Sequence, residues 1–419
     1  MADSTRIPPQ ADTTPHTALG TPPSERYERL AQTWRPIFAR IRASAVERDL
    51  AHRLPHEELA WLRETGFARV RLPHVHGGAS ATLPEFFALL IELGAADTNV
   101  VNALRAHFGF VEDVLTAPDS AWQARWLRQL GSGTVFGAGL SEAGGAKVGS
   151  FATALTRGPE GLRLNGTKFY TTGSLFADQI TVAAQDGDEV VYLQVPRTAP
   201  GVEVVDDWDG FGQALTASGT THFRDVKIEP DWLRPSTVRF PYAVAFYQLV
   251  HLASLAGIAR ALADDVALRV RQRDRVYSHG NAARVAEDPQ ILQVVGRIQS
   301  AAYAARTLTL QAAEAIQRSY DAHTDPAATE AQRLAPTTAA HVEVDQSVSV
   351  ITRLVLEAAT DLFDALGASA TLRTAGLDRY WRNARTIASH NPRVYRERQV
   401  GSYAVNGTPP PTSYRVGQG

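Results

Sequence analysis

The hydrophobic pattern of this chain changes its period twice, and this limits its fold more than any other feature does. Apolar residues recur with helical spacing over residues 25–131, short apolar and polar runs alternate over 132–239, and the helical spacing returns over 240–405. Alternation over short runs is typical of half-buried strands. The sequence therefore predicts an α+β protein with an N-terminal helical domain, a central antiparallel β-domain and a C-terminal four-helix bundle.

The two ends of the chain fall outside these three domains. Residues 1–24 contain five prolines and few apolar residues, so burial cannot offset the entropy lost on ordering them. We expect a disordered tail over 1–24 and a second tail over 406–419.

The central region carries three turn signals, namely Pro159-Glu160-Gly161, Asn165-Gly166 and Asp186-Gly187. Glycine and asparagine tolerate the positive φ angles that tight hairpin turns require. The sequence predicts a turn between strands at each of these places.

The C-terminal region contains long helices. One follows the apolar spacing of residues 249–270, and another runs over 344–366 until Gly367 ends it. The stretch "DPQILQVVGRIQSAAYAARTLTLQAAEAIQRSY" between them has the same period. A last helix covers 375–390, because Pro392 disfavours helical backbone at the residue before it.

Composition excludes several classes of function. The 42 basic and 44 acidic residues almost balance, so the chain lacks the basic charge expected of a nucleic-acid-binding protein. With no cysteine, disulfides, thiolate-held metals and cysteine nucleophiles are ruled out. The opening segment has no apolar signal region and no later segment approaches 18 uninterrupted apolar residues. We therefore expect a soluble, cytoplasmic protein that does not bind membranes.

Three segments of the central region could contact a ligand. "FGAGLSEAGG" contains Leu140 and Ser141, and its glycines free backbone amides that suit the polar edge of a flat heterocycle. "LNGTKFYTTGSLFAD" contains Tyr170 and Thr172 on one predicted strand face and Thr171 on the other. "DDWDGFGQALTASGTTHFRDVKI" contains Trp208 and Ser218. Taken singly, each segment also has a purely structural interpretation. The first could be an interdomain turn, the second an edge strand, and the third a packed aromatic residue beside a hairpin turn.

In this order and spacing, the three segments resemble those of the acyl-CoA dehydrogenase fold family, over roughly residues 25–405. "KFYTTGSLFAD", "DDWDGFGQALTASGT" and "DRYWRNARTIASHNP" are most similar to the branch of dibenzothiophene monooxygenases and sulfur-acquisition sulfone oxidoreductases. In the family, "LSE" matches the segment at the flavin pyrimidine and "FYTTG" lies along the isoalloxazine. The flavin contacts that the resemblance implies in the central domain are Leu140, Ser141, Tyr170, Thr171, Thr172, Trp208 and Ser218.

The resemblance also implies two catalytic histidines. Acyl-CoA dehydrogenases need a carboxylate as general base, yet the two matching places, "TIASHNP" and the surroundings of Tyr247, contain no Asp or Glu. The monooxygenase branch carries a histidine at the flavin instead, which matches His390, and an imidazole that titrates near neutrality suits proton donation to a flavin C4a-hydroperoxide. His107 matches a second active-site histidine of the branch, although a buried core histidine is an equally good interpretation. Some relatives have another histidine where this chain has Ile387.

Arginine is the natural bidentate ligand of phosphate. In the family an arginine reaches the flavin phosphate, often from a neighbouring subunit. The candidates in this chain are Arg273, Arg275 and Arg373.

The sequence thus predicts a two-component flavin-dependent monooxygenase that oxidises a small organic substrate, most readily at sulfur. No GxGxxG loop joins a strand to a helix, so no nicotinamide site is expected and a separate flavin reductase would supply the reduced flavin. The resemblance implies FMN more than FAD, and a homotetramer. Alternatives are an N- or C-hydroxylase, an acyl-CoA dehydrogenase and a non-catalytic helical binding protein.

Overall fold

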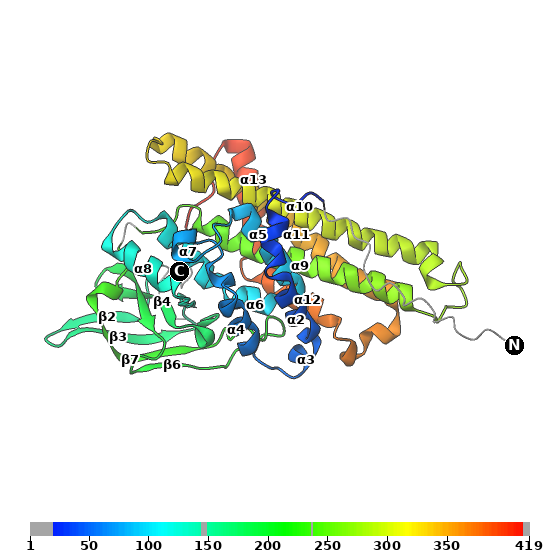
Figure 1. The fold of residues 1–419 in the computed structure, drawn as a ribbon, viewed down its shortest axis with the longest axis horizontal. Coiled ribbons are helices and arrows are strands. Elements are labelled where there is room, and N and C mark those ends of the chain that lie inside the picture. Colours follow the sequence, from blue (N-terminus) through cyan, green and yellow to red (C-terminus); the bar gives the residue numbers. More distant parts are fainter. Residues whose placement is uncertain (1–19, 144–148, 236–237, 414–419) are drawn as a thin grey trace.

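The computed structural model describes residues 20–143, 149–235 and 238–413. A β-sheet occupies one end of the molecule, three long helices run away from it, and short N-terminal helices pack between the two (Figure 1). The prediction of a disordered tail over 1–24 falls mostly on residues 1–19, which lie outside the described residues. Ser24 Oγ donates a hydrogen bond to Glu85 at 2.5 Å, and the Thr21 carbonyl accepts one from Arg306 at 3.1 Å, so these residues are held against the fold.

The N-terminal region is helical, as its spacing predicts. Its helices are α1 (Tyr27–Gln32), α2 (Arg35–Ala43), α3 (Ala45–Leu50), α4 (His56–Glu64), α5 (Leu83–Ala96), α6 (Thr98–Ala103), α7 (Arg105–Thr116) and α8 (Ala121–Gly131). The central one, α5, is buried along nearly its whole length. Thr82 starts it with a capping box, since its side chain accepts from the Glu85 amide and the Glu85 side chain accepts from the Thr82 amide.

The central domain is one seven-stranded sheet with the order β1-β4-β2-β3-β7-β6, and β5 pairs with β4. The strands are β1 (Phe136–Gly139), β2 (Ala154–Gly158), β3 (Gly161–Lys168), β4 (Gln179–Asp186), β5 (Glu189–Pro196), β6 (Val202–Val204) and β7 (Thr221–Ile228). Their inward residues, among them Leu164, Val182 and Phe223, form a separate hydrophobic core. Alternation therefore identified the strand-rich region correctly.

The predicted antiparallel arrangement is wrong in part, because β1 and β2 both run parallel to β4. The period-2 pattern shows which face of a strand is buried but carries no information on its direction. Turns at Glu160 and at Gly187 close hairpins as predicted, since Gly158 pairs with Gly161 and Asp186 with Glu189.

Asn165-Gly166, in contrast, lies inside β3 at a shift of register with β7, and is not a turn. Gly166 has a φ of 149°, and a Cβ there would lie 2.5 Å from Thr153. The glycine is needed for this close approach of neighbouring strands.

The C-terminal region is the predicted helical bundle with one helix more. It consists of α9 (Ala243–Gln272), α10 (Pro289–Thr324), α11 (Glu330–Leu366), α12 (Asp378–Ser389) and α13 (Arg393–Asn406). Gly367 ends α11 as expected. The helix before Pro392, α12, ends at Ser389, close to the predicted end. The chain then continues as α13, with Pro392 as its N-cap residue, because proline is tolerated where a helix begins.

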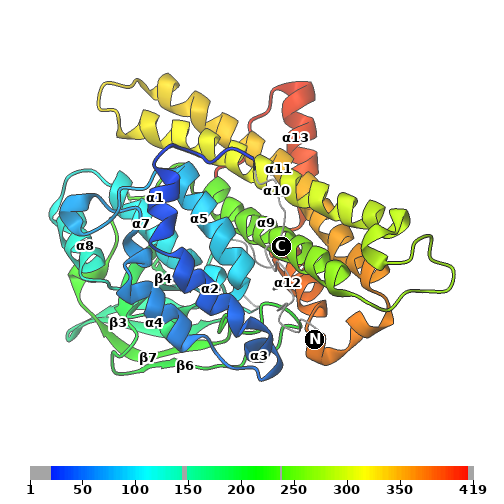
Figure 2. The ribbon, with the colours of Figure 1, turned by 45° about the vertical axis from the view of Figure 1, so that its right-hand side comes forward.

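Helix α9 is the centre of the fold, and Figure 2 shows it between α5 and the other long helices, with α12 beside it. It is the one described helix that is long and apolar enough to cross a membrane, and 89% of its apolar window is buried inside the protein. Such burial is what the core helix of a folded domain requires. Its Gly257 meets Gly94 of α5 so closely that a Cβ there would lie 2.5 Å from the Gly94 carbonyl carbon.

We expect Gly257→Ala to lower the stability of the protein by about 1–3 kcal/mol, because an added methyl forces two packed helix backbones apart. Gly296→Ala in α10 is the matched control, since a Cβ there meets nothing within 4 Å, and it should stabilise by up to about 1 kcal/mol. Thermal unfolding of both variants tests this. Equal melting temperatures would refute the close α5–α9 contact.

Candidate active site

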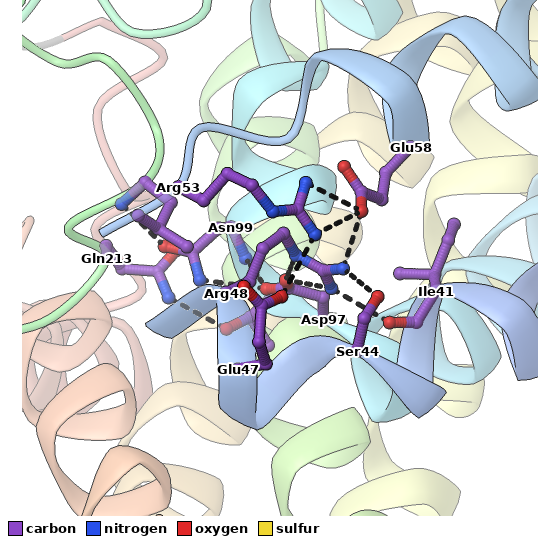
Figure 3. Close-up of polar contacts among 11 residues, drawn as sticks. Ile41, Ser44, Glu47, Arg48, Arg53, Glu58, Asp97, Asn99 and Gln213 are labelled. Atoms are coloured by element: carbon purple, nitrogen blue, oxygen red, sulfur yellow. Dashed lines mark hydrogen bonds and ion pairs between the residues drawn. The ribbon is translucent and has the colours of Figure 1, made fainter. Parts of the chain in front are cut away.

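A buried ion cluster centred on Arg48 joins the N-terminal helices (Figure 3). The Arg48 side chain is fully buried and pairs with Glu58 at 2.7 Å and Asp97 at 2.8 Å. It also donates to the Ile41 carbonyl at 2.8 Å. A buried guanidinium with two carboxylates is stable only because its hydrogen bonds are satisfied on several sides. Arg48 thus fixes α3, α4 and the start of α6 relative to one another.

Asp97 extends this cluster towards the β-domain. Its side chain accepts a hydrogen bond from the Asn99 amide at 2.9 Å and thereby caps α6. Asn99 in turn accepts from the Leu215 amide at 3.2 Å. Gln213 donates through its side chain to Thr98 at 2.8 Å.

The same loop is tied to the C-terminal bundle. The Gln213 amide donates to Asn383 of α12 at 2.7 Å, and the Gln213 carbonyl accepts from the Trp208 indole at 3.0 Å. The loop that carries Trp208 and Ser218 is therefore clamped between α6 and α12. The sequence analysis did not single out Gln213 or Asn383. Neither belongs to a recognisable motif, and their role is visible only once the loop packs against α12.

The predicted contacts of the central domain lie on neighbouring segments. The Thr172 and Ser218 hydroxyls are 2.7 Å apart, and Ser218 also bonds Thr216 at 2.7 Å. The Tyr170 ring packs edge-on to Trp208, with 5.7 Å between the ring centroids. We call Tyr170, Thr172, Trp208 and Ser218 the hydroxyl–aromatic strip.

The strip extends to the first segment. The Ser141 carbonyl accepts from the Phe169 amide at 2.9 Å and the Thr172 carbonyl accepts from the Ala138 amide at 3.1 Å. The exposed Ser141 and the partly buried Leu140 thus lie alongside residues 169–172. Thr171, in contrast, is buried and donates to the Gly219 carbonyl at 2.9 Å, so its hydroxyl faces inward.

The predicted strand alternation of residues 170–172 is wrong as a description of the backbone. Strand β3 ends at Lys168, and Tyr170 has a φ of 57°. A positive φ turns the chain out of the strand, which exposes the Tyr170 ring while Thr171 stays buried.

His390 is the C-cap residue of α12. Its ring packs against His251 of α9 at a centroid distance of 4.5 Å, and its Nε2 lies 3.4 Å from Arg105 of α7. Although solvent reaches the side chain, desolvation by the surrounding protein and then the charge of Arg105 lower the pKa of His390 to about 3, while a hydrogen bond with Asn391 opposes the shift. The ring is therefore neutral at neutral pH, contrary to the expected titration near pH 7.

His107 occupies a different environment. Its Nε2 bonds the Ala68 carbonyl at 2.7 Å, and its ring stacks on Phe136. Burial lowers its pKa to about 4. These contacts are those of a core histidine, and none of them is made with His390 or the hydroxyl–aromatic strip.

The predicted phosphate arginines lie apart from the strip. Arg273 follows α9 and donates to the Ala365 carbonyl at 3.3 Å. Arg275 and Arg373 are exposed. Figure 1 places the connection between α9 and α10 at the end of the molecule opposite the sheet, so a single chain does not bring Arg273 or Arg275 to the strip.

A cavity of about 170 Å³ lies between α4 and the turn at Gly173–Phe176. Arg63 and His56 line it together with apolar residues of α4 and α6. No predicted site residue contributes to its lining.

A helical domain, a sheet domain that carries the hydroxyl–aromatic strip, and a helical bundle with His390 beside α7 and α9 together have the organisation of a three-domain flavoenzyme fold. The chain belongs to the acyl-CoA dehydrogenase family: the models of the family's N-terminal, middle and C-terminal domains match residues 24–134, 137–226 and 249–393. This confirms the predicted family and fold class.

Individual relatives point to the predicted branch. The chain is 26% identical to the dibenzothiophene monooxygenase of Mycolicibacterium goodii, over 89% of this chain and 92% of that protein. It is 26% identical to the probable FMNH2-dependent monooxygenase SfnC of Pseudomonas putida, over 91% and 95%. The crystal structure of FMN-bound TdsC from Paenibacillus sp. A11-2 superposes with a TM-score of 0.82 at 28% identity, covering 92% of this chain and 99% of that one.

We expect Arg48→Met to destabilise the protein by about 3–5 kcal/mol, because it leaves the buried Asp97 without its cation and Glu58 with only the more distant Arg53. Arg53→Met is the matched control: Arg53 also pairs with Glu58, at 3.4 Å, but is 38% exposed, so its loss should amount to less than about 1 kcal/mol. Urea unfolding measures both. Similar losses for the two variants would contradict the central role of Arg48.

Proposed function

We propose that this chain is a two-component monooxygenase that uses reduced FMN and dioxygen to oxidise a small organic substrate at sulfur. One observation carries the proposal. Where a dehydrogenase of this fold needs a carboxylate base, this chain has a neutral His390, whose pKa is lowered by desolvation and then by the charge of Arg105. An imidazole with so low a pKa is a poor base for the α-proton of a thioester, but its one N–H can donate a hydrogen bond to an oxygen at the reacting centre.

The hydroxyl–aromatic strip fits the isoalloxazine of FMN. Thr172 and Ser141 offer hydroxyls and backbone groups to its polar edge, and the rings of Tyr170 and Trp208 offer apolar surface to its flat faces. Bound reduced FMN supplies the electrons that activate dioxygen. FMN as the cofactor agrees with the FMN-bound structural relative and with the FMNH2-dependent relative.

His390 is the residue of this chain that we place as a hydrogen-bond donor at the reacting centre. A guanidinium only donates hydrogen bonds, so Arg105 fixes His390 Nε2 as an acceptor and leaves the proton on Nδ1. Asn391, which follows it, donates to Gln248 of α9 at 3.1 Å. The end of α12 is thereby anchored to α9 and the imidazole is oriented before any substrate binds.

Sulfur as the oxidised atom rests on the named relatives. We infer that the reduced flavin comes from a separate reductase, by diffusion, and that the protein acts in the cytoplasm. A homotetramer agrees with the position of Arg273 and Arg275 far from the strip, because a phosphate contact by either would need a second copy. The domain limits of 25–131, 132–239 and 240–405 stay predictions.

The experiment that tests the function mixes the purified protein with chemically reduced FMN under air in the presence of dibenzothiophene. Oxygen uptake and the mass of the product are recorded. We expect products heavier by one or two oxygen atoms. Anaerobic reduction of bound FMN by an acyl-CoA would identify a dehydrogenase instead and overturn the proposal.

We expect Thr172→Ala to weaken FMN binding roughly two- to tenfold, because it removes one hydrogen bond worth about 0.5–1.5 kcal/mol. Thr167→Ala on β3 is the control, since Thr167 is exposed and bonds His222, and it should leave FMN affinity unchanged. Absorbance titration with FMN measures both. If Thr172→Ala leaves FMN affinity unchanged and lowers the melting temperature, Thr172 has a purely structural role.

We expect His390→Ala to lower product formation by about 10² or more, the usual effect of losing a positioned hydrogen-bond donor at a reacting centre, while FMN affinity and melting temperature stay close to wild type. Reduced FMN is then consumed with release of peroxide. Ser389→Ala is the control, because the Ser389 hydroxyl only bonds the Arg385 carbonyl at the helix end. A His390→Ala variant whose ratio of peroxide to product equals that of wild type would refute the catalytic role.

A further inference from the structure

His251 of α9 is a buried imidazole without a hydrogen-bond partner. It is 4% exposed, and within the described part of the chain neither of its ring nitrogens bonds a protein group. The sequence analysis did not single it out. Its position in the middle of an apolar helix gave no reason to do so.

The groups around His251 do not satisfy its nitrogens. His390 contacts it through ring packing, with the planes inclined by 48°. The nearby Gln248 side chain already accepts a hydrogen bond from Asn391. Burial, then the charge of Arg105, then His390 hold the pKa of His251 well below its usual range, so the ring is neutral and has one N–H donor and one acceptor nitrogen.

Other buried histidines of the chain are held differently. His107 bonds the Ala68 carbonyl, and His341 of α11 has a hydrogen bond with the backbone of Pro241. Buried polar groups are nearly always paired in this way, because an unpaired one is costly. His251 departs from the rule, and it does so beside the residue that we place at the reaction centre. A ligand with a hydrogen-bonding atom would satisfy it.

We propose that His251 is a specificity-determining residue that donates a hydrogen bond to an oxygen atom on the sulfur of the substrate. This inference rests on the proposed function. A sulfoxide oxygen is a small, uncharged and strong acceptor, which a neutral N–H in a buried site can bind without bringing a net charge out of water. A thioether has no such oxygen. The site therefore favours substrates that already carry one oxygen on sulfur.

The test compares two probes that differ by this one oxygen, dibenzothiophene and dibenzothiophene sulfoxide. Dissociation constants are measured for the FMN-loaded, full-length protein by quenching of tryptophan fluorescence. In His251→Phe, which keeps a ring but removes both nitrogens, binding of the sulfoxide should weaken about tenfold, the effect of one lost hydrogen bond. Binding of dibenzothiophene should change less than about twofold. His251→Gln restores an N–H and should recover part of the loss.

Stability separates this role from a structural one. His251→Phe should not lower the melting temperature, since it removes two unpaired polar atoms from the interior. His341→Phe, which breaks a hydrogen bond to the backbone, should lower it and leave the preference between the probes unchanged. Equal weakening of both probes in His251→Phe, or no weakening of either, overturns the inference alone. If the wild-type protein neither binds nor oxidises either probe, the proposed function is refuted, and this inference is refuted with it.

Discussion

The arrangement of the three domains depends on the buried ion pairs that Arg48 makes. It pairs with Glu58 and Asp97, two buried carboxylates whose desolvation it offsets. Because Asp97 also caps α6, the position of that helix follows from the ion cluster. The helix in turn receives the loop around Gln213 through Thr98 and Asn99. A charge in the N-terminal domain thus determines where a loop of the β-domain lies.

The loop around Gln213 connects this arrangement to the proposed flavin site. It is joined to α12 through Asn383 and presents Trp208 and Ser218 to the segment that contains Tyr170 and Thr172. Hydroxyls and aromatic rings from three separate stretches therefore meet on one edge of the sheet. The same contact at Asn383 anchors the middle of α12, the helix that His390 caps. The proposed binding surface and the helix that leads to His390 are in this way held by one connected network.

The histidine environment separates this chain from a dehydrogenase. Two imidazoles from α9 and α12 pack together beside Arg105 of α7, and both have lowered pKa values because burial and the guanidinium disfavour their protonation. A neutral pair with a fixed tautomer serves as a source of hydrogen bonds. A carboxylate at the same place would be attracted to Arg105 and would carry out a different reaction.

The sequence by itself determined the order of helical, strand and helical regions, the end of α11 at Gly367, the end of α12 before Pro392, and the family, because periods, breakers and motifs are local properties of the chain. It could not decide that β1 and β2 run parallel to β4, that Asn165-Gly166 stays inside a strand, or that the backbone turns at Tyr170. Those depend on which strands come together. Only the tertiary structure placed His107 in the core, put Arg105 and His251 beside His390, and lowered the pKa of that imidazole. Burial and neighbouring charge are properties of a packed environment, and residues from α7, α9 and α12 share one only after the chain has folded.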